Sequence, residues 1–480
     1  MKKPIFALLC LTTALSPARG AVFLQDYTNA ANGIDLRAGF IPDATRIVVG
    51  EPMFLTFVVS NHSAQLFEFQ HVRNEIFSVT ATNGAGQGVK SRYSGMDGNG
   101  FVTRETVRPG EGYARRIFLN ERLQFEEPGD YQVTCRCDFG YFSNRSNVLG
   151  RPIVTAFTLS VLPANPQRMA EIVQAWGQVI QANGALNEAA QALAEIDDPQ
   201  TIPLLASLVA KDASSYIAVQ ALARFTNAAA ADGLLPVLRH GEDYVAGIAR
   251  EGLSKSHQND RAARQLLPEL ESSDPVERIR TARALGWTGS ALAFAPLYSV
   301  LQAETGLVRY AAATAIGRSG DARSFEVLTN CLSDPDFALR LAAVNGLRAL
   351  GRPLQAAWVK PMIVSGGENI PTFYEAIDLL RIYGGEQAAP GLASCLHFDD
   401  PSVRHPYNFR LILALEYSPN GPQYFYKWHH DPNRDGTQAE LAENRQVLSE
   451  LKAWLSRQTQ NQAGRDAATP SLHRATKAQE

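Results

Sequence analysis

The strongest constraint on the fold is a 31-residue repeat in the C-terminal half of the chain. The stretch LVRYAAATAIGRSGDARSFEVL, residues 307–328, has the same skeleton as VERIRTARALGWTGSALAFAPL, which begins 31 residues earlier. Three series of positions keep this spacing: Arg278, Arg309 and Arg340; Leu285, Ile316 and Leu347; and Gly289, Gly320 and Gly351. Because three series coincide, the pattern indicates a repeat architecture.

Each repeat predicts a pair of helices. The first helix is rich in alanine, and the second is amphipathic, with apolar residues at i, i+3 and i+7. Small residues are expected where a first helix passes close to its neighbour, and these are Ala282, Ala284, Ala313 and Ala315. Gly286 and Gly317 are predicted to end the first helices. Since one helix pair cannot bury its apolar face alone, the pairs must stack into a solenoid with a long groove.

The apolar anchor of the repeat continues beyond the three clearest units. It recurs at Leu193, Leu222, Leu253, Leu380 and Leu415, which gives about eight helix pairs of 29 to 35 residues. We therefore predict an α-solenoid over residues 164–457. A last helix carrying Leu448, Leu451 and Leu455 is expected to cap it, and residues 458–480, which contain no aromatic residue, are predicted to be a disordered tail.

The central units resemble a known repeat family. Asp274-Pro275, Arg278, the segment ARALG and Gly289 are similar to a HEAT repeat of the short, phycobilisome-lyase-like type. The resemblance covers roughly residues 165–415 and is clearest over 274–359. It implies a right-handed α-solenoid whose curved face binds something, usually a protein. We expect Arg278, Arg309 and Arg340 to form a structural ladder between repeats rather than a ligand site.

The N-terminal region has a different period. Residues 34–161 contain short β-branched and aromatic runs that alternate with polar residues and are separated by turn clusters such as Pro128-Gly129-Asp130. This pattern predicts a sandwich of two antiparallel sheets over residues 21–163. The phrases VGEPMFLTFVVSN and EPGDYQVTC resemble strands of bacterial immunoglobulin-like domains. Pro163 and Pro166 are expected to separate the strands from the helices.

The first 20 residues have the features of a signal peptide. Lys2 and Lys3 precede an apolar core at 5–15, and small residues stand at Ala18 and Gly20. A buried first helix is the disfavoured alternative. We therefore expect a periplasmic or extracellular protein, and the absence of an apolar run of eighteen residues predicts no membrane span.

Four cysteines follow that segment: Cys135, Cys137, Cys331 and Cys395. Cys135 and Cys137 fall on one face of a predicted strand, where a mutual disulfide would be strained. No further Cys or His stands at a spacing that would complete a metal site. Buried free thiols are the favoured interpretation, and their oxidation state stays open.

A possible calcium loop lies near the C-terminus. Asp431, Asn433, Asp435 and Gly436 fit positions 1, 3, 5 and 6 of such a loop, but Ala442 stands where a bidentate Glu belongs. The favoured alternative is a turn that caps the final helix. The neighbouring pair His429-His430 is expected to be a solvated turn rather than a metal or acid–base pair. The aromatic segment QYFYKWHH, residues 423–430, could be either a binding edge or a capping contact.

No catalytic motif is present in the sequence. We find no Gly-x-Ser-x-Gly elbow, no His-Glu-x-x-His and no P-loop, and therefore expect no enzyme activity and no cofactor. The net charge of −3 gives no argument for a nucleic-acid partner. The leading hypothesis is an exported scaffold, monomeric or weakly oligomeric, whose groove binds a protein. Two alternatives remain: a lyase or chaperone for a prosthetic group, and a sandwich that binds carbohydrate or inhibits a protease with the solenoid as a spacer.

Overall fold

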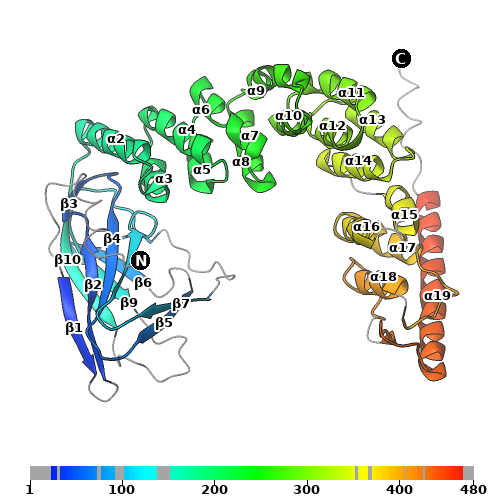
Figure 1. Ribbon diagram of the computed structural model, residues 1–480, viewed down its shortest axis with the longest axis horizontal. Coiled ribbons are helices and arrows are strands. Elements are labelled where there is room, and N and C mark those ends of the chain that lie inside the picture. The colour runs from blue at the N-terminus through cyan, green and yellow to red at the C-terminus, as the bar shows by residue number, and fades with distance from the viewer. Residues whose placement is uncertain are drawn as a thin grey trace. The chain divides into compact units, whose positions relative to one another are not determined.

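The computed structural model joins a β-sandwich to a helical repeat region (Figure 1). It divides into two compact units, Met1–Ser256 and His257–Glu480. The structure describes residues 23–29, 33–72, 77–91, 102–137, 152–351, 355–365, 370–404, 406–424 and 427–468. The predicted signal peptide at residues 1–20 lies outside these ranges.

Within the described residues, the sandwich consists of two four-stranded sheets and a two-stranded ribbon. The first sheet has the order β1 (Phe23–Asn29), β2 (Ile34–Pro42), β4 (Phe54–Asn61), β8 (Gly112–Phe118). The second has the order β3 (Arg46–Val48), β10 (Ile153–Leu162), β9 (Gly129–Cys137), β6 (Phe77–Asn83). The ribbon pairs β5 (Phe67–Val72) with β7 (Val102–Val107). The β3–β10 pair is parallel and the other pairs are antiparallel, so the predicted antiparallel sandwich is confirmed with one parallel pair at an edge.

Aromatic rings fill the space between the two sheets. The ring centroid of Phe57 lies 5.1 Å from that of Phe40 and 5.0 Å from that of Phe77. Along β9 every second residue from Tyr131 to Cys137 is buried, as the period of two predicts. The sandwich core is therefore built by inward-facing residues of both sheets.

A second apolar contact joins the sandwich to helix α2, which follows it in the chain. Strand β10 ends at Leu162, and α2 (Pro166–Gln181) begins after Asn165, whose side chain accepts a hydrogen bond from the backbone N–H of Arg168. Phe54 lies outside the core of the sandwich, yet only 2% of it is exposed. Its ring centroid is 5.9 Å from that of Trp176 on α2, so α2 covers the outer face of β4.

Arg116 fixes the next helix, α3 (Leu186–Glu195), to the same face of the sheet. Its guanidinium donates to both carboxylate oxygens of Asp43, at 2.9 and 2.6 Å, and its Nε lies 3.0 Å from Glu188 of α3. Burial raises the pKa of Glu188, and Arg116 partly opposes that rise. Through these contacts the sandwich belongs to the first compact unit, which extends to Ser256. The domain boundary at Pro163 stays a prediction. Independent folding of the two predicted halves stays a prediction.

The helices of the first unit alternate between two layers. After α2 and α3 come α4 (Ile202–Lys211), α5 (Tyr216–Leu222), α6 (Ala228–Gly233), α7 (Leu235–His240) and α8 (Asp243–Lys255). The first helices α3, α5 and α8 pack side by side, while α4 packs against α2, α6 and α7 in the other layer. The layered arrangement is that of stacked helix pairs.

The second unit repeats the same arrangement. Its helices are α9 (Asn259–Leu266), α10 (Pro275–Thr288), α11 (Phe294–Ala303), α12 (Gly306–Arg318), α13 (Ser324–Cys331), α14 (Phe337–Ala349), α15 (Ala356–Ser365), α16 (Ile370–Tyr383), α17 (Ala388–Ala393), α18 (Pro406–Glu416) and α19 (Gln438–Ala468). Short 3₁₀ turns precede or follow some of them: η3 (Pro199–Thr201) in the first unit, and η4 (Leu267–Glu271), η5 (Ala291–Ala293) and η7 (Gly385–Gln387) in the second. Figure 1 shows the first helices α10, α12, α14, α16 and α18 along one side of this unit.

The apolar anchor of the repeat is buried in every unit in which the sequence places it. Each anchor residue is at most 1% exposed: Leu193, Leu222, Leu253, Leu285, Ile316, Leu347, Leu380 and Leu415. Each lies at or near the C-terminal end of a first helix. The fold class predicted from the sequence, an antiparallel β-sandwich followed by a HEAT-like α-solenoid, is therefore confirmed.

The prediction that Gly286 and Gly317 end the first helices is wrong. Both lie inside helices, at the points where successive first helices touch. A Cβ added at Gly286 would lie 2.7 Å from the Cα of Ala315, and one added at Gly317 would collide with the backbone carbonyl of Gly346. Contact between neighbouring backbones, rather than helix termination, therefore requires glycine at these positions. The left-handed cap of α10 is Gly289, with φ of 66°.

The arginine series connects helices to loops. Arg278 donates to the carbonyl of Ser272 at 2.7 Å, Arg309 to that of Leu301 at 3.1 Å, and Arg340 to that of Asp334 at 2.7 Å. Two of them also form ion pairs with the loop that precedes the next first helix: Arg278 with Glu304 at 3.1 Å, and Arg309 with Asp334 at 3.0 Å. Gly320 and Gly351, like Gly289, have positive φ, at 79° and 70°. Within the array, the arginines therefore donate hydrogen bonds to loop carbonyls, and the glycines adopt the left-handed conformation of the turns.

The last helix is longer than the sequence predicts. Leu448 and Leu451 of α19 are buried and pack in the core of the second unit, as expected of a capping helix. However, α19 continues past Gln458 to Ala468, into the segment predicted to be disordered. Gln and Ala predominate in this stretch and are favourable helix formers, so an established helix can extend through it. Residues 469–480 lie outside the described part of the chain.

The glycine contact gives a direct test of the stacking. We expect Gly317→Ala to lower the free energy of unfolding by about 1–3 kcal/mol. The reason is that the methyl group of the alanine would meet backbone atoms rather than a movable side chain. The matched control is Gly247→Ala in α8, where a Cβ would meet nothing within 4 Å and stability should rise by about 0.5–1 kcal/mol. Denaturant unfolding of the full chain measures both. Equal effects of the two substitutions would contradict the close approach.

Candidate functional site on the first-helix face

Two hollows lie between neighbouring first helices, one in each compact unit. The α5–α8 groove of the first unit has a volume of about 740 Å³. The α16–α18 groove of the second unit has a volume of about 360 Å³. Each is lined by the residues that the two helices direct away from the buried anchor, so each is a product of the stacking itself.

Two tyrosines form one end of the α5–α8 groove. The rings of Tyr216 and Tyr244 stack with centroids 5.7 Å apart and an interplanar angle of 12°. Tyr244 is 68% exposed, and a hydrogen bond with Tyr216 raises its pKa. At the other end a Cβ added at Gly252 would lie 2.9 Å from the Cα of Ala223. The two helices thus approach each other closely at the end of the groove opposite the tyrosines.

The charges of the α5–α8 groove do not balance. Lys255 forms an ion pair with Glu251 at 2.6 Å. Arg224 is exposed and donates to the backbone carbonyl of Ala194, and it has no carboxylate partner within the described part of the chain. The groove therefore offers one arginine that is held in place without being neutralised.

The α16–α18 groove repeats this chemistry. Tyr374 and Tyr417 line it, and Tyr417 is 69% exposed. Arg381 forms an ion pair with Asp378 at 2.9 Å. The guanidinium carbon of Arg410 lies 4.9 Å from the ring centroid of Tyr374, and among the described residues Arg410 has no carboxylate partner. Here too one cation is paired, and a second rests on an uncharged group.

The two grooves share a set of side chains. Each has two tyrosines, an ion pair, one arginine without a carboxylate partner among the residues that the structure describes, and two aliphatic residues: Ile217 and Ile248 in the first groove, Ile377 and Leu413 in the second. Exposed aromatic rings and partly dehydrated guanidinium groups are the side chains that contribute most to protein–protein binding. The set is suited to binding rather than to acid–base chemistry.

Sequence reasoning did not identify these grooves, although the chain carries a signal for them. Tyr216 lies six residues before the anchor Leu222, and Tyr374 lies six residues before the anchor Leu380. Tyr310 occupies the same position before Ile316, where its hydroxyl donates to Asp336 at 2.6 Å. A recurring aromatic residue on the solvent side of first helices marks the same face in different units.

The proposed calcium ligands do not converge. Asp431 accepts a hydrogen bond from the backbone N–H of Asn433 and forms an ion pair with Arg434 at 3.1 Å, while the Asp435 side chain is 91% exposed. Within the described residues, no group of three or more His, Cys, Asp or Glu side chains could hold a metal ion. Arg434 organises this loop.

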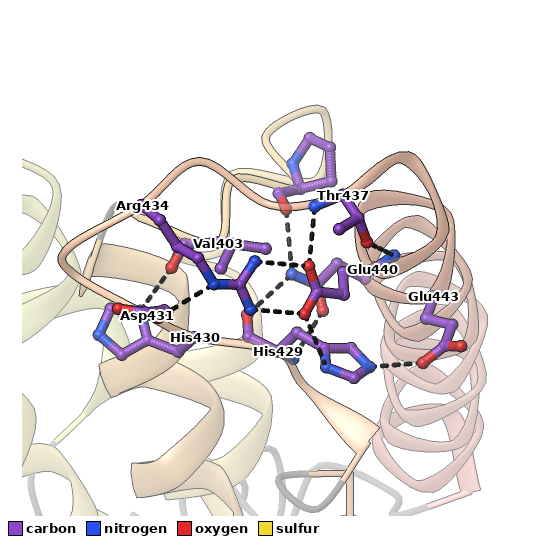
Figure 2. A network of polar contacts seen from close by, with 10 residues as sticks. Val403, His429, His430, Asp431, Arg434, Thr437, Glu440 and Glu443 are labelled. Atoms are coloured by element: carbon purple, nitrogen blue, oxygen red, sulfur yellow. Dashed lines mark hydrogen bonds and ion pairs between the residues drawn. The ribbon is translucent and has the colours of Figure 1, made fainter.

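The loop leads into the capping of α19 (Figure 2). Glu440 accepts from the backbone N–H of Thr437 at 2.7 Å, and the Thr437 hydroxyl accepts from the backbone N–H of Glu440 at 3.3 Å. Arg434 also donates two hydrogen bonds to Glu440, at 2.9 and 2.7 Å, and these bonds lower the pKa of that carboxyl. This reciprocal capping box fits the interpretation of the loop as a helix cap, with Thr437 as the capping residue.

The adjacent histidines make separate contacts (Figure 2). His429 pairs with Glu443 of α19, whereas His430 lies 2.8 Å from the carbonyl of Val403 and stacks on Phe409 with ring centroids 4.1 Å apart. Trp428, which precedes them, is 6% exposed and belongs to the core of the second unit. For the aromatic segment, burial of Trp428 favours the capping contact over the binding edge.

The four cysteines of the described chain are free thiols. Cys135, Cys137 and Cys395 are buried, and Cys331 is half-buried. Burial raises the pKa of Cys135 to about 12 and that of Cys395 to about 11, which keeps both thiols protonated. Their role in the structure is packing.

None of the helices in the described ranges combines the length and the apolar character needed to cross a membrane.

A calcium titration tests the capping interpretation. Millimolar calcium should leave the melting temperature unchanged, because the Asp431 carboxylate is already engaged by Arg434 and Asp435 points into solvent. Glu440→Ala should lower the melting temperature through loss of the capping box, whereas Asp435→Ala should have no effect. A calcium-dependent rise in melting temperature that Asp435→Ala abolishes would establish a metal site instead.

Comparison with known proteins agrees with the repeat. Residues 263–348 match the family of HEAT repeats, a segment that begins within α9, ends within α14 and includes the helix pairs α10–α11 and α12–α13. No curated protein matches the chain. HEAT repeats stack into extended surfaces that commonly mediate protein interactions. The chain is thus a β-sandwich followed by a HEAT-like repeat region.

Proposed function

We propose that this protein is an exported, non-enzymatic scaffold that binds a protein partner on its first-helix face. The observation that carries the proposal is the recurrence of one set of groove residues in both compact units: two tyrosines and an arginine that has no carboxylate partner in the described part of the chain. A stacked array needs its small residues and its anchor for folding. It does not need exposed Tyr244 and Tyr417, so these rings are available for binding.

The composition of the grooves favours a protein over other partners. A tyrosine buries a large apolar area at a low cost in conformational entropy and keeps a hydroxyl for hydrogen bonding. Arginine adds a planar group that stacks and donates several hydrogen bonds. Neither the lyase nor the carbohydrate-binding alternative is favoured by any feature of the two grooves. The subtype of HEAT repeat and the immunoglobulin-like kinship of the sandwich stay predictions.

Export is part of the proposal and rests on the sequence of residues 1–20. A fusion of residues 1–24 to a reporter should be delivered out of the cytoplasm and cleaved close to Gly20. The matched control replaces Lys2 and Lys3 with Glu and introduces Asp at Leu9, which removes the basic segment and interrupts the apolar core. If the reporter remains cytoplasmic with both sequences, the localisation is wrong.

Crosslinked capture from the native host envelope tests the binding face. Full-length protein carrying Tyr244→Ala and Tyr417→Ala should recover at least about tenfold less partner than the unmodified chain, because truncation of an interface tyrosine commonly costs more than 1 kcal/mol. The control is Tyr298→Ala, an exposed tyrosine on the second helix α11 that stacks on Phe294. Equal capture by all three proteins, or capture of nothing by any of them, would refute the proposal.

A further inference from the structure

We infer that each of the two grooves binds a peptide segment in which a carboxylate lies next to an apolar side chain. This inference rests on the proposed function, because it names the chemistry of the partner that the first-helix face receives. It follows from three properties that both grooves share: a cation without a carboxylate partner, an aromatic wall, and an aliphatic surface beside them.

The arginines indicate that the bound peptide is acidic. Arg224 is tethered to the carbonyl of Ala194, and Arg410 rests on the ring of Tyr374. In each case the guanidinium is positioned by an uncharged group, and most of its five N–H donors remain available. A carboxylate from a partner would supply the missing counter-charge in a bidentate geometry. Because the arginines are already held in place, little side-chain entropy is lost on binding.

The aliphatic and aromatic residues of each groove indicate that an apolar side chain lies next to the carboxylate in the peptide. In the α16–α18 groove, Ile377 and Leu413 lie beside Tyr417, and in the α5–α8 groove Ile217 and Ile248 lie beside the stacked tyrosines. An apolar side chain placed there would bury the exposed ring faces. The carboxylate and the apolar group must therefore be close together in the partner sequence, since a single groove contains both of their sites.

The same charges argue against a nucleic acid. A surface that follows a phosphate backbone presents a continuous series of cations. Each groove instead combines one unpaired arginine with a carboxylate, Glu251 in the first and Asp378 in the second. These carboxylates would repel consecutive phosphates but leave room for a single acidic side chain. A short acidic and apolar peptide satisfies both the cation and the aromatic wall.

Selection from a random twelve-residue peptide library displayed on phage tests the inference on the full-length protein. The expected pool is enriched in Asp and Glu adjacent to aromatic or aliphatic residues. A synthetic peptide from that pool should bind at least about tenfold more weakly when its carboxylates are replaced by amides. Enriched peptides without an excess of acidic residues would overturn the inference, as would stronger binding of single-stranded oligothymidine than of the selected peptides.

Variants of the protein assign the effect to the grooves. Arg224→Gln with Arg410→Gln should weaken binding of the selected peptide at least about tenfold and abolish the acidic enrichment. The matched control, Arg37→Gln with Arg280→Gln, alters one exposed arginine in each unit, both of which already pair with carboxylates, and should bind as the unmodified chain does. Equal binding by both double variants would place the acidic peptide elsewhere and overturn the inference.

The two proposals fail separately. If the tyrosine variant loses the native partner while peptide selection shows no acidic preference, the scaffold function stands and only the partner chemistry is wrong. If the tyrosine variant keeps the native partner, the first-helix face is not the binding surface, whatever the peptides show.

Discussion

The backbone contact between successive first helices is the constraint on which the repeat region depends. At Gly286 and Gly317 the neighbouring helix comes so close that a side chain would meet its backbone. This approach buries the anchor residues such as Ile316 completely, and a single helix pair could not bury them alone. It also fixes which positions remain outside. In the α5–α8 pair, where Gly252 meets the backbone of Ala223, the groove residues are those that such a contact leaves on the solvent side.

A second interaction makes the sandwich part of the helical array in the first unit. Arg116 holds Asp43 of the sandwich and Glu188 of α3 at once, and Phe54 packs on Trp176 beside it. The outer face of β4 is consequently covered by helices, which explains why both faces of this strand are buried. The α5–α8 groove lies within this same compact unit. The sandwich therefore contacts α3, the first helix that packs beside α5.

The sequence alone could predict neither the ion pairs of the Asp431 loop nor the two grooves. The calcium loop was open to both interpretations because Asp431, Asn433 and Asp435 have a ligand-like spacing. The structure engages Asp431 with Arg434, and Arg434 with Glu440, which is a partnership that spacing alone does not encode. The grooves were missed for a similar reason. Their residues come from two helices, and no single segment contains the set.

The sequence by itself determined the architecture: a period of two before Pro163, helix pairs after it, and an anchor that is buried wherever the repeat places it. These features follow from the local periodicity of apolar and polar residues, which is visible in the sequence without knowledge of any tertiary contact. Only the tertiary structure decided that Gly317 is a contact rather than a cap, and that Arg410 lies on Tyr374 without a carboxylate partner in the described chain. Both depend on what a neighbouring helix brings to the position, and a linear pattern does not contain that distance.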